Sequence, residues 1–246
     1  MKKFTVLFII CFVVILTSCK SILTKIITTR SIVNNAYYLQ KNDQKVIFLP
    51  MVHLSKARNF EEVKKFIAEK RQLGYTVYYE KVTYDKDSAN FYEVSLKMRK
   101  LTGLTFGQTY LSDEQKEFKE NSNKKKYVWQ SSIDYGLDYK VDIHADYTLS
   151  SLIKAYEDKH GTVKLQECDY DTPLNTEYKC STPIKYREVV HDLRNAKLMR
   201  HILLDTVNNK KLIVYGLGHY YASTGVYLNL FHYNQYKEIK ARNWKD

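Results

Sequence analysis

The sequence lacks an apolar run long enough to cross a membrane as a helix. Its most apolar stretch begins at Phe4 and ends at Leu16, with two lysines before it and small polar residues after it. A helical span needs about 20 residues, so a transmembrane helix is disfavoured. A basic start, a short apolar run and small polar residues are together typical of a secretory signal sequence.

Acidic residues are few in comparison with basic ones. The chain has 27 Asp and Glu against 39 Lys and Arg, a net charge of +12. Loss of residues 1–18 removes two lysines and no acid, which leaves 37 basic and 27 acidic residues and a net charge of +10. The chain also lacks zinc-finger spacing, an RNA-binding aromatic–glycine signature and a basic helix. We therefore expect attraction to anionic lipid or acidic polymer, and no nucleic acid partner.

Cysteine is scarce too, with four in the whole chain. Cys11 lies inside the apolar run, which leaves Cys19, Cys168 and Cys180 in a processed protein. An oxidising compartment allows Cys168 and Cys180 to pair across a short loop. Two unpaired thiols are the alternative, because two cysteines alone are weak evidence for a disulfide.

The residues LTSC, which end at Cys19, resemble a bacterial lipobox. The resemblance implies cleavage before Cys19 and acylation of its thiol and new amino group. Several acyl chains, at about 0.8 kcal/mol per buried CH2, make a durable anchor. We expect residues 1–18 to be a lipoprotein signal peptide, 19–35 a membrane tether and 36–246 a single domain. The protein should be exported and lipid-anchored, on a periplasmic face or the cell surface.

A βαβ unit is predicted by residues 46–80. Residues 46–49 are a short apolar run, typical of a strand buried on both faces. Apolar residues then recur near helical spacing over 60–73, Gly74 is suited to end that helix, and 75–79 are β-branched or aromatic. A right-handed crossover brings the carboxyl ends of both strands side by side, where α/β proteins bind ligands.

The rest of the chain continues the alternation of strands and helices. This pattern predicts one α/β domain with a mixed, mostly parallel central sheet flanked by helices. Charged residues 121–126 should form a surface loop. We expect helices over 86–100, 112–121, 150–159, 183–207 and 224–232, strands near 141–143 and over 212–215, and an edge strand within 236–242.

Histidines and acidic residues follow the predicted strands. His53 and Glu80 follow the first two, His144 and Asp146 follow the strand near 141–143, and His219 follows 212–215. Imidazole nitrogen and carboxylate oxygen suit Mn, Co, Fe or Zn, and two histidines with one carboxylate leave positions open. The hypothesis is a divalent metal held by His53, Glu80 and His219. Their convergence depends on the topology, and each histidine taken alone has a structural role as its alternative.

Four stretches resemble one family when taken together: PMVH, VYYE, LRNAKLM and VYGLGH. They resemble the TraB, PrgY and GumN group, which includes the Tiki-type metalloproteases. Its wider superfamily includes erythromycin esterases and ChaN-like haem-binding lipoproteins. The resemblance covers residues 37–233. It implies the α/β fold of that superfamily and a site made of two Gly-x-x-His motifs, a glutamate and an arginine, here His53, Glu80, Arg194 and His219.

The two histidine motifs differ in how well they match. The second is intact, from Gly216 to His219, whereas Pro50 stands where the first has glycine. Proline fixes φ and lacks an amide hydrogen, so the first loop cannot approach a ligand in the same way. His144 and Asp146 fall in a stretch similar to one that many members carry before a helix.

The resemblance implies hydrolysis of a peptide or ester bond in a peptide or small-molecule substrate. A bound metal lowers the pKa of a water and polarises a carbonyl, while Arg194 holds a carboxylate or an oxyanion. In a metal-free version, His53 is the general base and Glu80 orients it. An ordinary helix salt bridge with Asp192 or a neighbour is the alternative for Arg194.

A second class of function is binding without catalysis. Tyrosines crowd the region of the second motif and can stack on a haem or a glycan. Core packing and composition bias are the alternative for them. A lipoprotein that binds haem, a glycan or a peptide is thus the alternative function. These tyrosines are Tyr215, Tyr220, Tyr221, Tyr227, Tyr233 and Tyr236.

Overall fold

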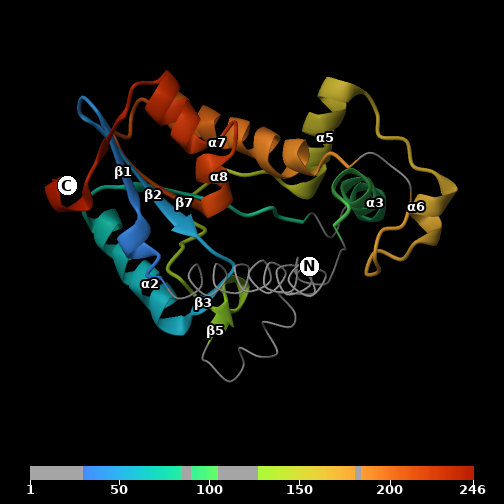
Figure 1. Ribbon diagram of the computed structural model, residues 1–246, viewed down its shortest axis with the longest axis horizontal. Helices are drawn as coiled ribbons and strands as arrows, with labels where there is room; N and C mark the ends of the chain where they lie inside the picture. The colour runs from blue at the N-terminus through green and yellow to red at the C-terminus, as the bar shows by residue number, and fades with distance from the viewer. Residues whose placement is uncertain (1–29, 85–89, 105–126, 181–183) are drawn as a thin grey trace, which may run out of the picture.

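The computed structural model describes residues 30–84, 90–104, 127–180 and 184–246 (Figure 1). Several predictions lie outside these residues: the signal sequence, Cys19, the first part of the expected tether, the helix expected over 112–121 and the loop expected over 121–126. No helix within the described ranges is both long and apolar enough to cross a membrane.

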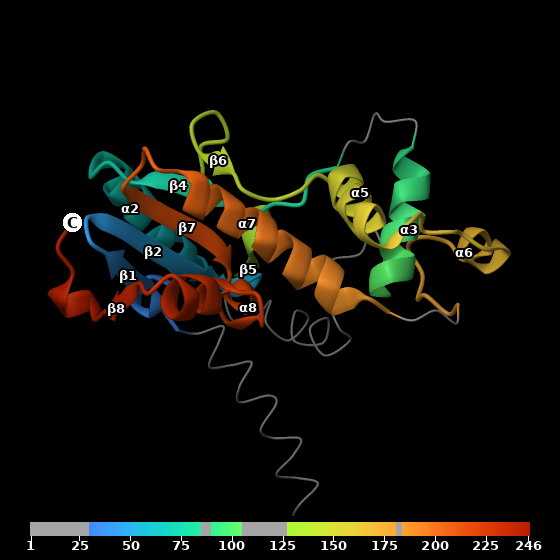
Figure 2. The same cartoon turned by 90° about the horizontal axis from the view of Figure 1, so that it is seen from above.

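A six-stranded sheet forms the centre of the protein (Figure 2). Neighbouring strands pair in parallel from β6 to β2, while β1 is antiparallel to β2 and β8 is antiparallel to β1. The predicted α/β fold with a mixed, mostly parallel sheet is confirmed. In spatial order the strands are β6 (Ile143–His144), β4 (Thr76–Tyr79), β7 (Lys210–Gly216), β2 (Gln44–Met51), β1 (Tyr37–Lys41) and β8 (Lys237–Ile239).

Helices cover both faces of this sheet. Helix α2 (Ala57–Gln72) packs on one face, and α7 (Leu193–Leu204), α8 (Leu217–Tyr221) and the π-helix η4 (Tyr227–Tyr233) pack on the other. In β2, Phe48 contributes to the α7 side and Leu49 to the α2 side, both fully buried. Burying such a side chain is worth about 1.5–3 kcal/mol, which explains the continuous apolar run.

The predicted βαβ unit forms, but its two strands are not neighbours. Strand β7 lies between β2 and β4, so that Val214 pairs with Leu49 on one side and with Tyr79 on the other. The expected side-by-side placement of the two strand ends is therefore wrong. A local pattern predicts the crossover, but a strand from much later in the chain can insert between its strands.

Pro50 belongs to β2 itself rather than to the loop after it. It pairs with Tyr215 of β7 and lies beyond the end of β1, which begins at Tyr37 opposite Phe48. One side of the β2 backbone is therefore free of a strand partner at Pro50. This is a position at which a sheet tolerates proline.

Residues 30–35, expected as tether, pack on the domain. Ile32 is only 4% exposed and joins the core under α2. The side-chain amide of Asn59 in α2 donates to the carbonyl of Arg30. A 3-10 turn, η1 (Val33–Asn35), then leads into β1.

A helical lobe lies at the end of the molecule away from the sheet (Figure 1). Helices α3 (Phe91–Thr102) and α5 (Leu149–His160) build it around an apolar cluster that includes Leu101, Leu152 and Val189. Helix α6 (Glu167–Asp171) is bound to α3 through polar contacts, such as that of Arg99 with the Asp169 carbonyl. The predicted disulfide between Cys168 and Cys180 is present and ties α6 to the following segment.

The long helix expected over 183–207 begins by Tyr186 and contains a π-helical turn, η3 (Glu188–Asp192), before α7. Pro183, its expected start, lies outside the described residues. The helix connects the lobe to the sheet. Its apolar positions predicted a helix, but no residue pattern indicated the π turn.

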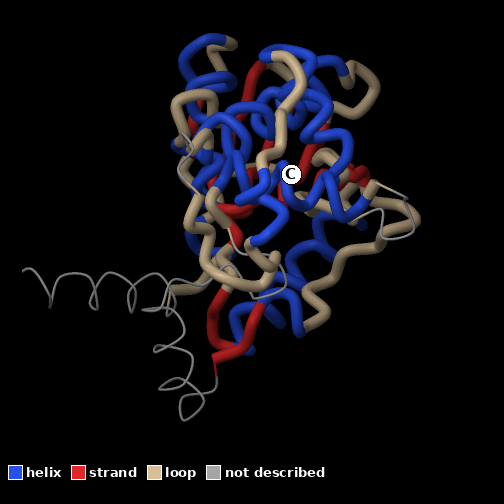
Figure 3. The backbone as a smooth tube through the Cα atoms, turned by 90° about the vertical axis from the view of Figure 1, so that its right-hand side faces the viewer, coloured by secondary structure: helices blue, strands red, loops and turns tan. Residues whose placement is uncertain are grey.

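The remaining predictions are confirmed in place and corrected in extent. Expected strand 212–215 is β7, helix 150–159 is α5, and edge strand 236–242 is the shorter β8. Two features were not predicted: the strand β1, and a small separate sheet in which β3 (Leu54–Lys56) pairs with β5 (Tyr127–Trp129) (Figure 3). Short 3-10 turns complete the described elements, η2 (Gln130–Ser132) and η5 (Ala241–Asn243).

Candidate active site

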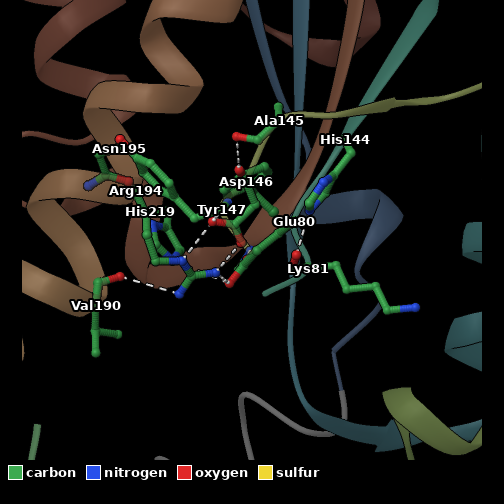
Figure 4. A network of polar contacts seen from close by, with 12 residues as sticks. Glu80, Lys81, His144, Ala145, Asp146, Tyr147, Val190, Arg194, Asn195 and His219 are labelled. Atoms are coloured by element: carbon green, nitrogen blue, oxygen red, sulfur yellow. Dashed lines mark hydrogen bonds and ion pairs between the residues drawn. The ribbon is translucent and has the colours of Figure 1, made fainter. Parts of the chain in front are cut away.

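A buried polar cluster forms at the carboxyl ends of the parallel strands (Figure 4). Glu80 directly follows β4, Asp146 follows β6, and His219 lies in α8, which begins where β7 ends. Arg194 reaches them from the first turn of α7. Four of the residues expected at the site are thus brought together.

Arg194 binds both carboxylates of the cluster. Its Nε and one terminal nitrogen donate to the two oxygens of Asp146 at 3.0 and 2.6 Å, and the same terminal nitrogen donates to Glu80 at 2.5 Å. Asp146 is fully buried, so its charge needs this bidentate partner. Burial would lower the pKa of Arg194, but Glu80 and Asp146 raise it above its ordinary value. The expected alternative, a salt bridge with Asp192, does not form.

Glu80 is held by three groups. Besides Arg194, the Gly216 N–H donates to Oε2 at 2.6 Å, and His219 Nε2 lies 3.3 Å from Oε1. Burial works against ionisation, but Arg194, His219 and the Gly216 N–H hold the pKa of Glu80 well below its usual range. A Cβ on Gly216 would lie 3.1 Å from Oε2, which explains why glycine suits the first position of the motif.

A hydrogen-bond chain fixes the orientation of His219. Thr224 donates to Asp192 at 2.8 Å, and the Asn195 amide nitrogen lies 3.4 Å from the Thr224 hydroxyl oxygen. The Asn195 carbonyl oxygen therefore faces His219 Nδ1, at 2.6 Å, and accepts its hydrogen. In the neutral ring Nε2 then carries the lone pair, so it hydrogen-bonds Glu80 Oε1 only after it has taken up a proton.

His191 is a neighbour that sequence reasoning missed. Its ring lies 5.2 Å from that of His219, and its buried Nδ1 has no hydrogen-bond partner among the described residues. Burial, His219 and Arg194 lower the pKa of His191, so the ring is neutral near pH 7. His191 lies in the π turn η3, and π turns are frequent at functional sites. Asn195 and Thr224 were missed as well, because nothing in their spacing distinguishes them.

His53 and His144 stand apart from the cluster. His53 is exposed, and within the described ranges its side chain forms no hydrogen bond or ion pair with Glu80, Arg194 or His219. His144 lies beside the ring of Tyr79, and its Nε2 is 2.5 Å from the carbonyl oxygen of Lys81 (Figure 4).

The expected metal ligands do not converge in this arrangement. Nowhere in the described ranges do three or more His, Cys, Asp or Glu side chains form a group that could hold a metal ion. Both oxygens of Glu80 are engaged, and the Arg194 cation shares Oε1 with His219 Nε2. A divalent cation between Glu80 and His219 would be repelled by Arg194 at close range. The donor set therefore does not fit the expected metal.

The tyrosines near the second motif differ in burial, and Tyr227 is partly buried against the core. Tyr215, Tyr220 and Tyr236 are buried in the core, as core packing predicts. Tyr221 and Tyr233 are 57% and 72% exposed.

Fold and cluster together define an α/β protein with a buried His–Glu–Arg–Asp site at the carboxyl ends of its parallel strands. Comparison of the chain with protein-family models, curated proteins and solved structures finds no match.

Proposed function

We propose that the protein is an exported, lipid-anchored hydrolase of ester or peptide bonds in which His219 acts as the general base on water. The observation that carries the proposal is the placement of His219 between Asn195 and Glu80, with Nδ1 bound and Nε2 directed at a carboxylate. A histidine oriented through one nitrogen and basic at the other is the arrangement that general-base catalysis requires.

The charges of the cluster favour the transfer of a proton from water to His219. When His219 Nε2 takes a proton from water, the resulting imidazolium lies 3.3 Å from Glu80 Oε1. Glu80, Asp146 and Arg194 together carry a net charge of −1, which stabilises the cation. The hydroxide equivalent then adds to the carbonyl carbon of the substrate, and the imidazolium returns its proton to the leaving group.

Arg194 and His191 supply two further polar groups next to Glu80 and His219. One terminal nitrogen of Arg194 donates only to the Val190 carbonyl, at 3.3 Å, among the described residues, so it keeps an N–H for a developing oxyanion. His191 offers an unpartnered Nδ1 that can bind water or the leaving group. Glu80 retains 19% of its side-chain surface exposed, which gives the cluster access to solvent.

Hydrolysis of p-nitrophenyl esters and of a fluorogenic peptide library tests the proposal. His219→Ala should lower turnover by about 10²–10⁴-fold, the usual contribution of a general base to the rate. His232→Ala, which removes an exposed histidine outside the cluster, should retain it. Equal turnover in the wild type and His219→Ala would refute the proposal. Assays with EDTA and with added Mn²⁺, Co²⁺ or Zn²⁺ test the metal-dependent version directly.

Export is supported by the disulfide, since such bonds persist in oxidising compartments. Radiolabelled fatty acid should enter the wild type and be absent from Cys19→Ala. Label that persists in the variant would contradict the lipid anchor.

Non-catalytic binding of a haem, glycan or peptide is the second candidate. The observation that favours it is the exposed Tyr221, which packs edge-on against Tyr37 and lies 5.9 Å from the Tyr227 ring. Aromatic rings of this kind stack on sugars and porphyrins. A Soret band on addition of haem, or glycan binding lost in Tyr221→Ala, would support binding, whereas hydrolysis lost in His219→Ala would support the enzyme.

A further inference from the structure

A second polar region lies along the C-terminal part of α7, beyond the candidate active site. A cavity of about 760 Å³ lies between this helix and the edge of the sheet, where β4 and β6 contribute Tyr78 and Ile143. Lys197, Arg200 and Leu204 line it from α7 at helical spacing, and His201 lies beside them. A cavity of this size is within the range of about 300–1,000 Å³ that small ligands occupy.

The cavity carries an excess of uncompensated positive charge. Among the described residues no carboxylate pairs with Lys197, Arg200 or His201. Lys197 Nζ instead lies 4.3 Å from the centre of the Tyr147 ring. Burial lowers the pKa of Lys197, and burial together with Lys197 lowers that of His201. These basic groups are thus close enough to repel one another.

The one carboxylate that lines the cavity is already satisfied. Asp205 accepts hydrogen bonds from the Tyr78 hydroxyl and the Asn208 side chain, and from the Val207 and Asn208 N–H groups. Its charge is taken up within the turn that ends α7. Within the described ranges, Lys197 and Arg200 therefore form no ion pair, although Asp146 raises the pKa of Lys197 from a greater distance.

We propose that this cavity binds a small organic anion, a phosphate or carboxylate carried on an apolar or aromatic body. The anionic group is bound by the cations of Lys197 and Arg200, and the His201 ring beside them can donate a hydrogen bond to it. The body packs against Ile143, Leu204 and the ring of Tyr78. The volume is larger than an inorganic ion needs, and the apolar lining selects against one. This inference does not rest on the proposed hydrolase function.

The test uses the fluorescent anion 1-anilinonaphthalene-8-sulfonate as the probe with the whole chain. The neutral N-phenyl-1-naphthylamine is the matched control, because it lacks only the sulfonate. Arg200→Gln and Lys197→Gln should each weaken binding of the anion by about fivefold or more, the effect of one charged contact. Lys154→Gln makes the same charge change on α5, away from the cavity, and should leave binding unchanged.

Two further measurements test where the anion binds and to which chemical class it belongs. Ala196→Trp, at an exposed position that lines the cavity, should abolish anion binding by filling it, with circular dichroism to verify folding. Phenyl phosphate or benzoate should displace the probe, whereas inorganic phosphate at the same concentration should not. Equal affinity for the neutral probe, equal weakening in Lys154→Gln, or retained binding in folded Ala196→Trp would each overturn the proposal.

Discussion

At the scale of single residues, Arg194 decides how the cluster is assembled. It is 7% exposed and lies between two carboxylates from different strands, Glu80 and Asp146. Neither carboxylate has another cationic side chain that is permanently charged within contact among the described residues. The site is therefore an interlocked set of charges rather than a collection of independent side chains.

Arg194→Met should lower the free energy of unfolding by about 3–5 kcal/mol at pH 7, because it leaves two buried carboxylates unpaired. The difference from the wild type should shrink as the pH falls, since the unpaired carboxylates then take up protons. Chemical denaturation at pH 7 and pH 5 measures both effects. Arg200→Met, on the exposed face of the same helix, should stay within about 0.5 kcal/mol of the wild type.

His53 and His219 should behave differently on substitution. His53→Ala removes an exposed side chain that has no contact with the cluster, so turnover and melting temperature should stay near those of the wild type. His219→Ala should lose turnover, and the double variant should match it. If His53→Ala lost as much turnover as His219→Ala, the shared metal site predicted from the sequence would regain support.

At the scale of elements, the turn between α7 and β7 depends on a single carboxylate. Burial opposes ionisation of Asp205, but the Tyr78 hydroxyl and the N–H groups of Asn208 and Val207 lower its pKa to about 2. An aspartate whose pKa is depressed stabilises the fold above its unfolded pKa of about 3.9, and this stabilisation is lost as the pH falls through the folded value.

Asp205→Asn should therefore reduce the free energy of unfolding at pH 7 by about 2 kcal/mol. The difference from the wild type should begin to shrink below about pH 4, when the unfolded aspartate takes up its proton. Urea denaturation between pH 7 and pH 3 measures it. Asp158→Asn on α5, whose side chain is 63% exposed, is the matched control and should change little. A constant difference across this range would contradict the argument.

Elements with a continuous local pattern could be predicted from the sequence, and those defined by distant partners could not. The strand β2, the helix α2 and the strand β7 follow from apolar runs and periodicity. The insertion of β7 between β2 and β4 depends on pairing across most of the chain, which no local pattern records. The pairing of β3 with β5 was missed for the same reason.

The residues of the candidate site divide in the same way, into those that a local pattern predicts and those that only tertiary packing brings together. Glu80, Asp146 and His219 follow strands whose ends are visible in the sequence, and Arg194 was expected from the resemblance. Asn195 adjoins Arg194 yet serves His219 through a contact that only the packing of α7 on α8 creates. His53 was misplaced because β2 continues past Pro50 and the chain then turns into β3.

At the scale of the whole molecule, one helix connects the apolar cluster of the lobe to the sheet, which carries an apolar cluster on each face. The lobe of α3, α5 and α6 has its own cluster, separate from the clusters on the two faces of the sheet. Its polar interior is also self-contained, since buried Asp169 pairs with Lys100 at 2.6 Å. The lobe should therefore lose structure independently of the sheet.

Replacing Cys168 and Cys180 by serine should destabilise the lobe by about 3 kcal/mol, from the loop-closure entropy of a short disulfide loop. Hydrogen exchange should accelerate in α6 and its surroundings while the sheet keeps its protection. Reduction of the wild type with dithiothreitol should have the same effect. Loss of protection in both parts at one denaturant concentration would show that the lobe and the sheet unfold as one unit.

The position of β7 also has a consequence for how the chain acquires its structure. This strand is the shared partner of β2 and β4, but it comes much later in the chain than either of them. Until residue 216 is present, both earlier strands keep apolar faces and backbone groups without their central partner. Such late, long-range pairing makes folding slow and leaves the unfinished chain prone to aggregation. The parallel part of the sheet can therefore close only after the chain up to residue 216 has been made, which exposes β2 and β4 for most of that synthesis.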